Sequence, residues 1–226
     1  MDITIKALYE APYATLAKEM LEGCTYPWEA LDKIKDTILE IGATLSLDEY
    51  DHPEEDVWIA KDAKVYPTAY IAGPCIIGKG TEVRPGAFIR GNALVGDGAV
   101  VGNSTELKNV ILFDKVQVPH YNYVGDSILG YKAHMGAQAL TSNVRSDKKL
   151  VVIKNEGEAV ETGRKKVGAF LGSRVEVGCS TVLNPGTIIG HDTNVYPESS
   201  VRGVVPAESI YKSKYFVEIV TKKNDD

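Results

Sequence analysis

The sequence predicts a mainly β protein, a parallel β-helix built from six-residue repeats, with an α-helical segment before it. Aliphatic residues recur at every sixth position: Ile59, Val65, Ile71, Ile77, Val83, Ile89, Val95, Val101 and Leu107. A helix repeats every 3.6 residues and a strand every two, so neither explains this period. A triangular coil does, because each hexad supplies one short strand and one corner and points its aliphatic residue into the shaft.

The first expected elements are helices. Apolar residues at helical spacing predict an amphipathic helix, and they are Trp28, Leu31, Ile34, Ile38 and Ile41. Gly42 suits the left-handed conformation that often follows a helix end, so we expect the helix to stop there. A weaker helical pattern covers residues 11–22.

Residues 1–56 precede the repeats and are expected to form a helical cap over the open end of the shaft. The first coil of a solenoid exposes unpaired strand edges, which must be covered. The polar run at 46–56 is interpreted as the connection to the first coil. An arm that docks a partner protein is the alternative role for the whole segment.

The β-helix itself is expected over residues 57–205. Two steps of its aliphatic pattern are five residues long, from Leu107 to Leu112 and from Val124 to Leu129, which predicts two local tightenings. The six-residue period returns later in the chain, at Leu171, Val177, Leu183, Ile189, Val195 and Val201.

A charged insertion interrupts this pattern, and a tail follows it. Residues alternate around Asn155-Glu156-Gly157 within 144–166, which predicts a protruding β-hairpin inserted into the β-helix. Long loops in compact repeats are often functional. Residues 206–226 are expected to form a C-terminal tail.

Composition sets wide limits on function. The chain has 226 residues, a formal charge of −6 and a pI near 5.3, which gives no general reason to bind nucleic acid or an acidic membrane surface. No apolar run approaches the ~18 residues of a membrane span, so we expect a cytoplasmic protein. Three widely spaced cysteines, Cys24, Cys75 and Cys179, favour buried reduced thiols over disulfides or a zinc knuckle.

One stretch carries a family resemblance. Residues 101–143 read VGNSTELKNVILFDKVQVPHYNYVGDSILGYKAHMGAQALTSN. They resemble the C-terminal acetyltransferase domain of bifunctional N-acetylglucosamine-1-phosphate uridyltransferase, with its VGNxxExK, His-x-x-Tyr-x-Gly-Asp and GAGTxxxN motifs. The later run ETGRKKVGAFLG is similar to the archaeal sugar-1-phosphate nucleotidylyltransferases that carry the same domain. The resemblance covers about residues 59–205.

The resemblance implies a left-handed parallel β-helix, a homotrimer with active sites between subunits, and acetyl-CoA as co-substrate. The implied reaction is N-acetylation of a phosphorylated amino sugar, of the glucosamine-1-phosphate or galactosamine-1-phosphate type. No metal is implied in the site. The handedness rests on the family alone, because parallel crossovers are otherwise almost always right-handed.

The resemblance also implies the catalytic residues. His120 matches the family's general base, which removes a proton from the sugar amine; imidazole suits this step because its usual pKa lies near ~6.5. Tyr123 matches a tyrosine that contacts the sugar phosphate. Glu106 and Lys108 match an acid and a base near the sugar and its phosphate, with a surface ion pair as the alternative interpretation.

Asn143 matches a catalytic asparagine that contacts substrate, and a phosphate-binding lysine is expected six residues later, at Lys149. Lys148 is a direct competitor for that role. For the phosphate-binding arginine, Arg84 lies in an RPGA string like the family's, but Arg90 has the family's sixteen-residue spacing to Glu106. We choose Arg90, because a shift of one hexad moves a residue to another face of the prism.

For acetyl-CoA, Ala137 matches the alanine of GAGT and Ser173 matches a serine near the thioester. A backbone N–H there would stabilise the thioester oxyanion. The small residues also suit any tight solenoid corner. Gln138 departs from the family, because it stands where GAGT has its second glycine, and we expect it to narrow the site or change the substrate. The nucleotidyltransferase half of the relatives has no counterpart in residues 1–56.

Two rival functions are weighed. The γ-class carbonic anhydrases use the same solenoid with three histidines around zinc, but their close histidine pair has no match among His52, His120, His134 and His191. The other rival is a non-enzymatic trimeric scaffold or regulator that binds a nucleotide-sugar or a protein partner.

Overall fold

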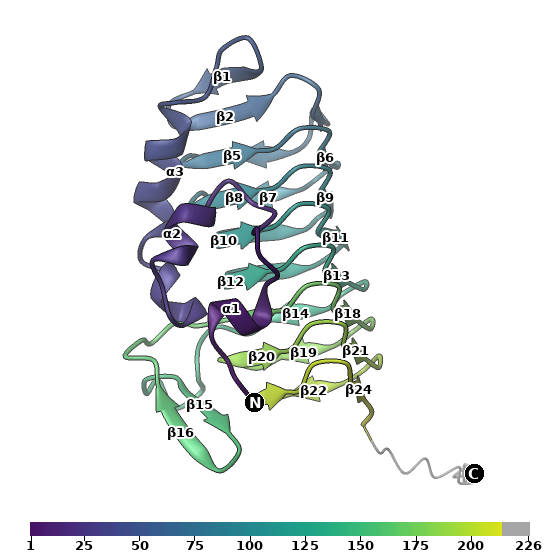
Figure 1. The fold of residues 1–226 in the computed structure, drawn as a ribbon. Helices are drawn as coiled ribbons and strands as arrows, with labels where there is room; N and C mark the ends of the chain where they lie inside the picture. The colour runs from purple at the N-terminus through teal and green to yellow at the C-terminus, as the bar shows by residue number, and fades with distance from the viewer. Residues whose placement is uncertain (214–226) are drawn as a thin grey trace, which may run out of the picture.

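The computed structural model describes residues 1–213 and shows a solenoid of stacked three-sided coils (Figure 1). Each coil contributes one short strand to each of three faces, and strands of successive coils pair in parallel. The expected fold class, a mainly β solenoid with short N-terminal helices, is confirmed. The predicted tail from residue 214 onward lies outside the described residues.

Three faces make up the prism. The first face contains β2 (Val57–Ala60), β5 (Cys75–Ile77), β8 (Ala93–Val95), the second halves of β10 (Glu106–Leu112) and β12 (Tyr123–Leu129), β17 (Ala169–Leu171), β20 (Thr187–Ile189) and β23 (Val204–Val205). The second contains β3 (Lys64–Val65), β6 (Glu82–Val83), β9 (Val100–Asn103), β11 (Gln117–His120), β13 (His134–Met135), β18 (Glu176–Val177), β21 (Asn194–Val195) and β24 (Ile210–Tyr211). The third contains β4 (Tyr70–Ile71), β7 (Phe88–Ile89), the first halves of β10 and β12, β14 (Leu140–Thr141), β19 (Val182–Leu183) and β22 (Ser200–Val201).

The shaft holds the residues of the six-residue pattern. From Ile77 to Val201 these side chains are buried, whereas Ile59, Val65 and Ile71 in the first coil are partly buried. The solenoid extends past the predicted boundary at 205, because β24 pairs with β21 of the coil above. Ile210 and Tyr211 therefore belong to the last described coil and not to a tail.

The two five-residue steps mark a tightened corner between the third and first faces. β10 and β12 run through this corner without a break, and one left-handed residue bends each strand, Asn109 at φ 54° and Asp126 at φ 49°. Asn and Asp tolerate this conformation better than most residues. The coil above uses two left-handed residues, Gly91 and Asn92, and needs six residues for the same step.

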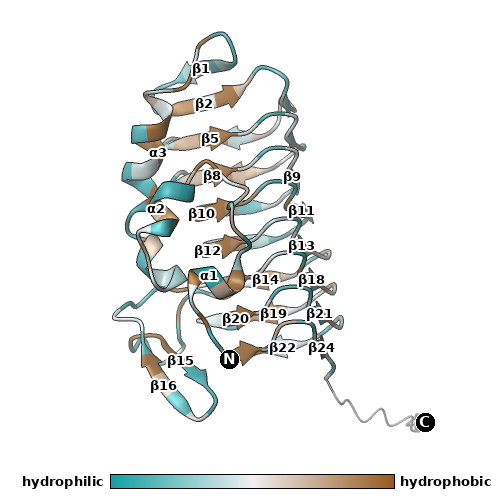
Figure 2. Cartoon of the chain, in the orientation of Figure 1, coloured by the Kyte–Doolittle hydropathy of each residue, from teal (hydrophilic) through white to brown (hydrophobic). Residues whose placement is uncertain are grey.

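The first face also carries hydrophobic residues that point away from the shaft. They stack from coil to coil in the order Trp58, Ile76, Leu94, Ile111, Ile128, Phe170 and Ile188. All are buried. Strands buried on both sides read as continuous apolar runs, so another part of the chain must cover this face. Figure 2 shows this hydrophobic colouring on first-face strands such as β2 and β12.

The N-terminal segment supplies the cover, and the expected cap over the open end is wrong for most of it. Its helices are α1 (Ile5–Leu8), α2 (Lys18–Glu22), the 3-10 helix η1 (Pro27–Ala30) and α3 (Ile34–Gly42). α3 packs against β5, β8 and β10, and the Trp28 and Phe170 rings lie 6.3 Å apart. Figure 1 shows these helices along the side of the coil stack.

At the open end, β1 (Tyr50–Glu54) covers the edge of the first face. It pairs antiparallel with β2, within the stretch 46–56 that the sequence suggests as a connection. An antiparallel strand closes the edge of the first coil, which a loop would leave exposed.

Gly42 does not act as a left-handed helix stop. It is the last residue of α3, and the backbone of Ala43 beyond it remains helical, at φ −62°. A Cβ at Gly42 would lie 2.5 Å from the Trp58 ring, so the glycine allows close packing of α3 on the first coil. The predicted single helix is also split, because η1 and α3 are separate turns.

The inserted segment contains the expected hairpin. β15 (Val152–Asn155) pairs antiparallel with β16 (Glu158–Glu161) around a turn at Glu156 and Gly157. The base of the hairpin is tied to the N-terminal segment by an ion pair between Arg164 and Asp32. Figure 1 places it beside the lower coils.

Candidate active site

Five predicted residues gather on the third face. Arg90 donates to Glu106 at 2.7 Å, and β10 places Glu106 beside Tyr123 of the next coil. Lys108 lies two residues after Glu106, so it points to the same outer side of β10. Asn143 follows β14 one coil further down and donates to the Tyr123 hydroxyl at 3.1 Å. The choice of Arg90 over Arg84 agrees with this grouping, since Arg84 pairs with Glu82 on the second face.

Gly125 explains how Tyr123 reaches Asn143. A Cβ at Gly125 would lie 2.4 Å from the Tyr123 hydroxyl oxygen and 2.7 Å from its ring carbon Cζ. The ring therefore lies flat across the third face over the glycine. The Tyr-x-Gly part of the motif thus has a steric reason: only a residue without a side chain leaves room for the ring.

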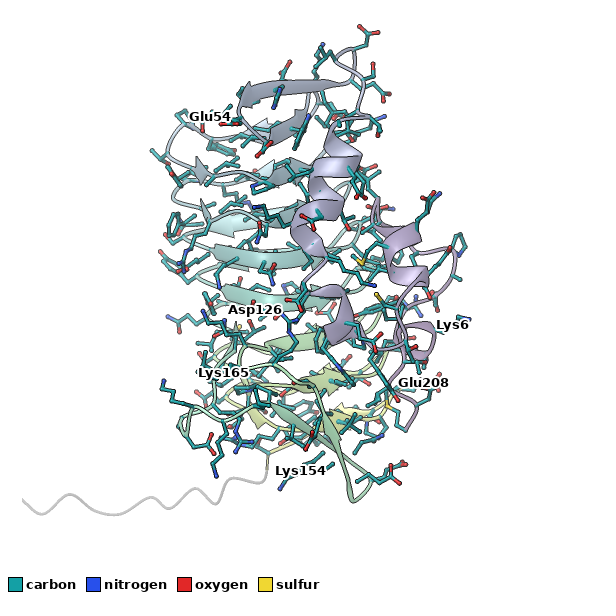
Figure 3. All side chains as sticks on the ribbon, turned by 90° about the vertical axis from the view of Figure 1, so that its left-hand side faces the viewer. Lys6, Glu54, Asp126, Lys154, Lys165 and Glu208 are labelled. Carbon is teal, nitrogen blue, oxygen red and sulfur yellow. The ribbon has the colours of Figure 1, made fainter. Side chains whose placement is uncertain are left out.

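A buried carboxylate, Asp126, organises one edge of this cluster. Its side chain is 4% exposed and accepts hydrogen bonds from Asn143 at 2.6 Å and from Asn109 at 3.0 Å. Lys108 places its ammonium 3.9 Å away. Asp126 lies on the coil stack beside the N-terminal helices (Figure 3), and Asn109 also donates to the Leu31 carbonyl of that segment at 3.3 Å.

Sequence reasoning missed Asp126 as a site residue. Two signals pointed to it: it ends the His-x-x-Tyr-x-Gly-Asp motif, and it lies within the second five-residue step. A buried carboxylate must be paired or hydrogen-bonded. The left-handed corner turns its side chain to where Lys108, Asn109 and Asn143 can reach it.

The cluster changes the acidity of Tyr123. Burial raises the pKa of the Tyr123 phenol above its usual value, and the nearby carboxylates of Asp126 and Glu106 raise it further. The hydroxyl therefore stays protonated at neutral pH and can donate a hydrogen bond. Together with Arg90 and Lys108 it forms a surface suited to an anionic, hydroxyl-bearing ligand.

His120 lies at the opposite edge of the third face. It ends β11 on the second face, and the left-handed Tyr121 turns the chain toward Tyr123. Its side chain is exposed and has no hydrogen bond or ion pair within residues 1–213. The backbone of Tyr123 therefore lies near His120, and its hydroxyl lies at Asn143. His120 itself does not contact the cluster.

Ala137 occupies the coil position below His120. β11 pairs with β13 through Gln117 and His134. His120 and Ala137 each lie three residues after this pair, so they are aligned in successive coils. Cys179 follows in the next coil and is exposed, so the expectation of three buried thiols is wrong for it, whereas Cys24 and Cys75 are buried. Ala137 and Cys179 are both small, and Pro197 takes the same position in the coil below them.

Gln138 fits the glycine position because the corner requires a left-handed residue. Its φ is 62°, and Ser104, Tyr121 and Ser180 adopt the same conformation at this corner in neighbouring coils. The Gln138 side chain accepts a hydrogen bond from the Ser180 hydroxyl at 3.3 Å. The glycine of the family motif is therefore a backbone requirement that Gln138 also meets.

Ser173 and Lys149 are not brought to the other site residues within this chain. Ser173 lies at the corner between the first and second faces, and its backbone N–H donates to the Leu8 carbonyl at 3.3 Å. That N–H therefore already has an acceptor within this chain. Lys149 lies on the exposed loop before β15, where its backbone N–H donates to Asp147.

The other histidines have separate surroundings. His52 stacks on Trp58 with ring centroids 5.0 Å apart, His134 contacts Glu176 at 2.7 Å, and His191 contacts Asp192 at 2.8 Å. Within the described residues, no three His, Cys, Asp or Glu side chains come together as metal ligands would. The same part of the chain has no helix long and apolar enough to cross a membrane.

Comparison with known proteins identifies the family. Residues 71–220 match the family described as the GMPPB C-terminal domain. The chain belongs to this family. It is a hexapeptide-repeat domain like the acetyltransferase domain of GlmU and of the archaeal bifunctional nucleotidylyltransferases, as the motifs suggest.

Several curated relatives match part of the chain. The bifunctional protein GlmU of Methanococcus maripaludis is 35% identical over 124 residues, which are 55% of this chain and 30% of that protein. The bifunctional sugar-1-phosphate nucleotidylyltransferase/acetyltransferase of Sulfurisphaera tokodaii is 34% identical over 112 residues, 50% of this chain and 28% of that protein. The chain thus spans less than a third of these relatives.

In two further matches, a larger share of the matched protein is covered. YaiX of Escherichia coli, described as an uncharacterized acetyltransferase, is 29% identical over 173 residues, 76% of this chain and 74% of that protein. A crystal structure of a hexapeptide transferase family protein from Anaplasma phagocytophilum is 15% identical, covers 74% of this chain and 80% of that chain, and superposes with a TM-score of 0.40.

Proposed function

We propose that this protein is an acetyl-CoA-dependent N-acetyltransferase that acts on an amino-sugar 1-phosphate of the glucosamine or galactosamine type. One observation carries the proposal: Arg90, Lys108, Tyr123 and Asn143 form a polar surface on the third face, at the motif positions of the family. The archaeal relative whose name includes sugar-1-phosphate and acetyltransferase supports the substrate class.

In the proposed reaction, the sugar amine attacks the carbonyl carbon of the thioester. His120 takes the proton from the attacking nitrogen as the C–N bond forms. The C–S bond then breaks, and the CoA thiolate leaves with the proton that His120 returns. Histidine is the side chain that most often serves as a general base of this kind.

The remaining residues bind and orient the substrates in this proposal. Arg90, Lys108 and Tyr123 hold the sugar phosphate, with Glu106 orienting Arg90 through their ion pair. Asn143, fixed by Asp126, directs the sugar amine. Ala137 and the coil positions below it form the path for acetyl-CoA. Lys149, which lies away from the other site residues within one chain, would contact the phosphate held by a neighbouring copy.

A homotrimer with sites between subunits is part of the proposal. His120 and the Asn143 cluster lie at opposite edges of the third face and do not contact each other within one chain. A neighbouring copy would bring its cluster against His120. The first face is already covered by the N-terminal segment, which leaves the second and third faces for this contact.

The test is a free-thiol release screen with acetyl-CoA and a panel of amino sugars. Glucosamine-1-phosphate or galactosamine-1-phosphate should release CoA, and unphosphorylated glucosamine should be much poorer. His120→Ala should lower turnover by roughly 100- to 10,000-fold without changing the melting temperature. His134→Ala, a histidine on the second face, is the matched control. Wild-type turnover in His120→Ala would reject the base assignment.

A further inference from the structure

A cavity lies next to the candidate site, between the inserted hairpin and the lower coils. It has a volume of about 600 Å³. Its walls include Ser142 and Arg145 from the loop after β14, Lys154 from β15, and Asn184 and Arg202 from the ends of β19 and β22. Ligand-binding pockets commonly fall in this size range. None of the proposed catalytic or binding residues lines it.

The side chains that line this cavity carry more positive than negative charge. Arg145 is paired with Asp147 through two hydrogen bonds of 2.9 and 2.6 Å, so these two charges offset each other. Lys154 and Arg202 form no ion pair within residues 1–213. In a chain with a net charge of −6, two unpaired cations facing one cavity mark a local preference for an anion.

The coil geometry sets the distance from the candidate site. Ser142 donates its backbone N–H to Leu183, and Asn184 donates to Val201, so Ser142, Asn184 and Arg202 take the same place in successive coils. At about 4.8 Å per coil, Arg202 lies roughly 10 Å below Ser142. Asn143 adjoins Ser142. A ligand held at Asn143 can therefore reach Arg202 only with an anionic group roughly 10 Å from the part that Asn143 holds.

We propose that this cavity is a diphosphate-binding subsite. Arg202 offers a planar guanidinium that can bind two phosphate oxygens at once, and Lys154 offers a point charge from the facing hairpin. Figure 3 shows Lys154 on the hairpin below Asp126. The inference rests on the proposed function only for the source of the diphosphate. That source is either CoA itself or a nucleoside-diphosphate-linked amino sugar, which would then be the acceptor in place of the sugar 1-phosphate.

The first experiment measures binding without any reaction. Isothermal titration with inorganic pyrophosphate should show binding to the wild-type protein and at least tenfold weaker binding to the double variant Lys154→Gln/Arg202→Gln. Lys61→Gln, an exposed lysine on the first coil, is the matched charge control. Equal binding by wild type and double variant overturns the proposal, as does an equal loss in the control. A thermal melt checks that each variant is folded.

Steady-state kinetics then distinguishes the sources. A rise in KM for a nucleoside-diphosphate-linked amino sugar, with the KM for acetyl-CoA unchanged, assigns the subsite to the acceptor. The reverse pattern assigns it to CoA. If both KM values stay unchanged, the cavity is not a subsite of this reaction and the proposal fails. If pyrophosphate binding is lost in the variant but no amino sugar releases thiol, the subsite stands and the proposed function fails.

Discussion

Gly125 is the residue on which the geometry of the cluster depends. Replacing it with Ala should push the Tyr123 hydroxyl away from Asn143, because the added Cβ would overlap the ring. The ring is partly exposed, so we expect it to move outward with little change in stability. We expect kcat/KM for the amino-sugar phosphate to fall about tenfold or more, which corresponds to losing one charge-assisted or well-placed hydrogen bond.

Tyr123→Phe provides the comparison for that prediction. It removes the same hydroxyl but keeps the ring in place, so its kinetic effect should match that of Gly125→Ala. The two variants should not add when combined, since both act on one contact. Wild-type kcat/KM in Gly125→Ala would show that the ring position is unimportant.

Gly42 shows the same steric principle in a buried setting. Gly42→Ala would place a Cβ inside the Trp58 ring, which is 8% exposed and also stacks on His52. The ring cannot move outward freely, so we expect a loss of about 1–3 kcal/mol in the free energy of unfolding. Gly23→Ala is the control, because its nearest atom would be 3.4 Å away. Equal melting temperatures for both variants would contradict this packing.

At the scale of elements, the sequence predicts the shaft well and the N-terminal segment poorly. A repeating local pattern is sufficient to assign Val83, Val101 and Val118 to the interior. The position of α3 depends instead on a long-range fit between its apolar side and the outward-facing residues of the first face. The signal was present, since Ile76-Ile77 and Leu94-Val95 are paired aliphatic residues that a solvent-exposed strand would not need.

In the candidate site too, some residues could be placed from the repeat and others depend on contacts between distant parts of the chain. Residues with a fixed spacing along the coil, such as Arg90, Glu106 and Tyr123, could be placed from the register. Ser173 could not, because its backbone donor is taken by Leu8, which is far away in the sequence. Asp126 escaped notice because its importance comes from burial and from three neighbours, two on the coil above and one on the coil below.

Arg174 ties the N-terminal segment to the lower coils. Its guanidinium bonds Glu10 at 2.6 and 2.8 Å and Asp192 at 2.7 Å. The hydrogen bond from Arg174 lowers the pKa of Asp192 to about 2 and also lowers the pKa of Glu10. A carboxylate with a lowered pKa in the folded state stabilises the fold above its unfolded pKa of about 3.9, and this contribution disappears as pH falls toward 2.

We therefore expect Arg174→Gln to flatten the acid dependence of stability. Between about pH 4 and pH 2 the wild type should lose urea resistance more steeply than the variant, because only the wild type has this contribution to lose. Lys132→Gln is the control, since Lys132 has a similar left-handed backbone and pairs with no carboxylate among residues 1–213. Parallel curves for wild type and Arg174→Gln would mean that the network adds nothing to folding.

At the scale of the whole molecule, the surfaces of the prism suggest how copies assemble. The first face is buried under the N-terminal segment, and β1 covers the edge of its first strand, β2. The third face still exposes Tyr70 and Phe88, whose rings lie 5.6 Å apart, beside Arg90. Exposed aromatic pairs of this kind are common at subunit interfaces. A contact there would place the polar cluster of one chain near a neighbour.

The inter-subunit site can be tested by mixing two inactive variants. His120→Ala lacks the base and Asn143→Ala lacks the residue that orients the amine, so each should be inactive alone. If each site takes His120 from one chain and Asn143 from the next, one of the four possible pairings at an interface is intact. Trimers reassembled from an equal mixture should then regain about a quarter of wild-type activity. Unmixed variants refolded alone are the control, and light scattering should give a mass of about 74 kDa for each assembly. Failure of the mixture to exceed the separate variants, with trimers present, would place both residues in one chain's site.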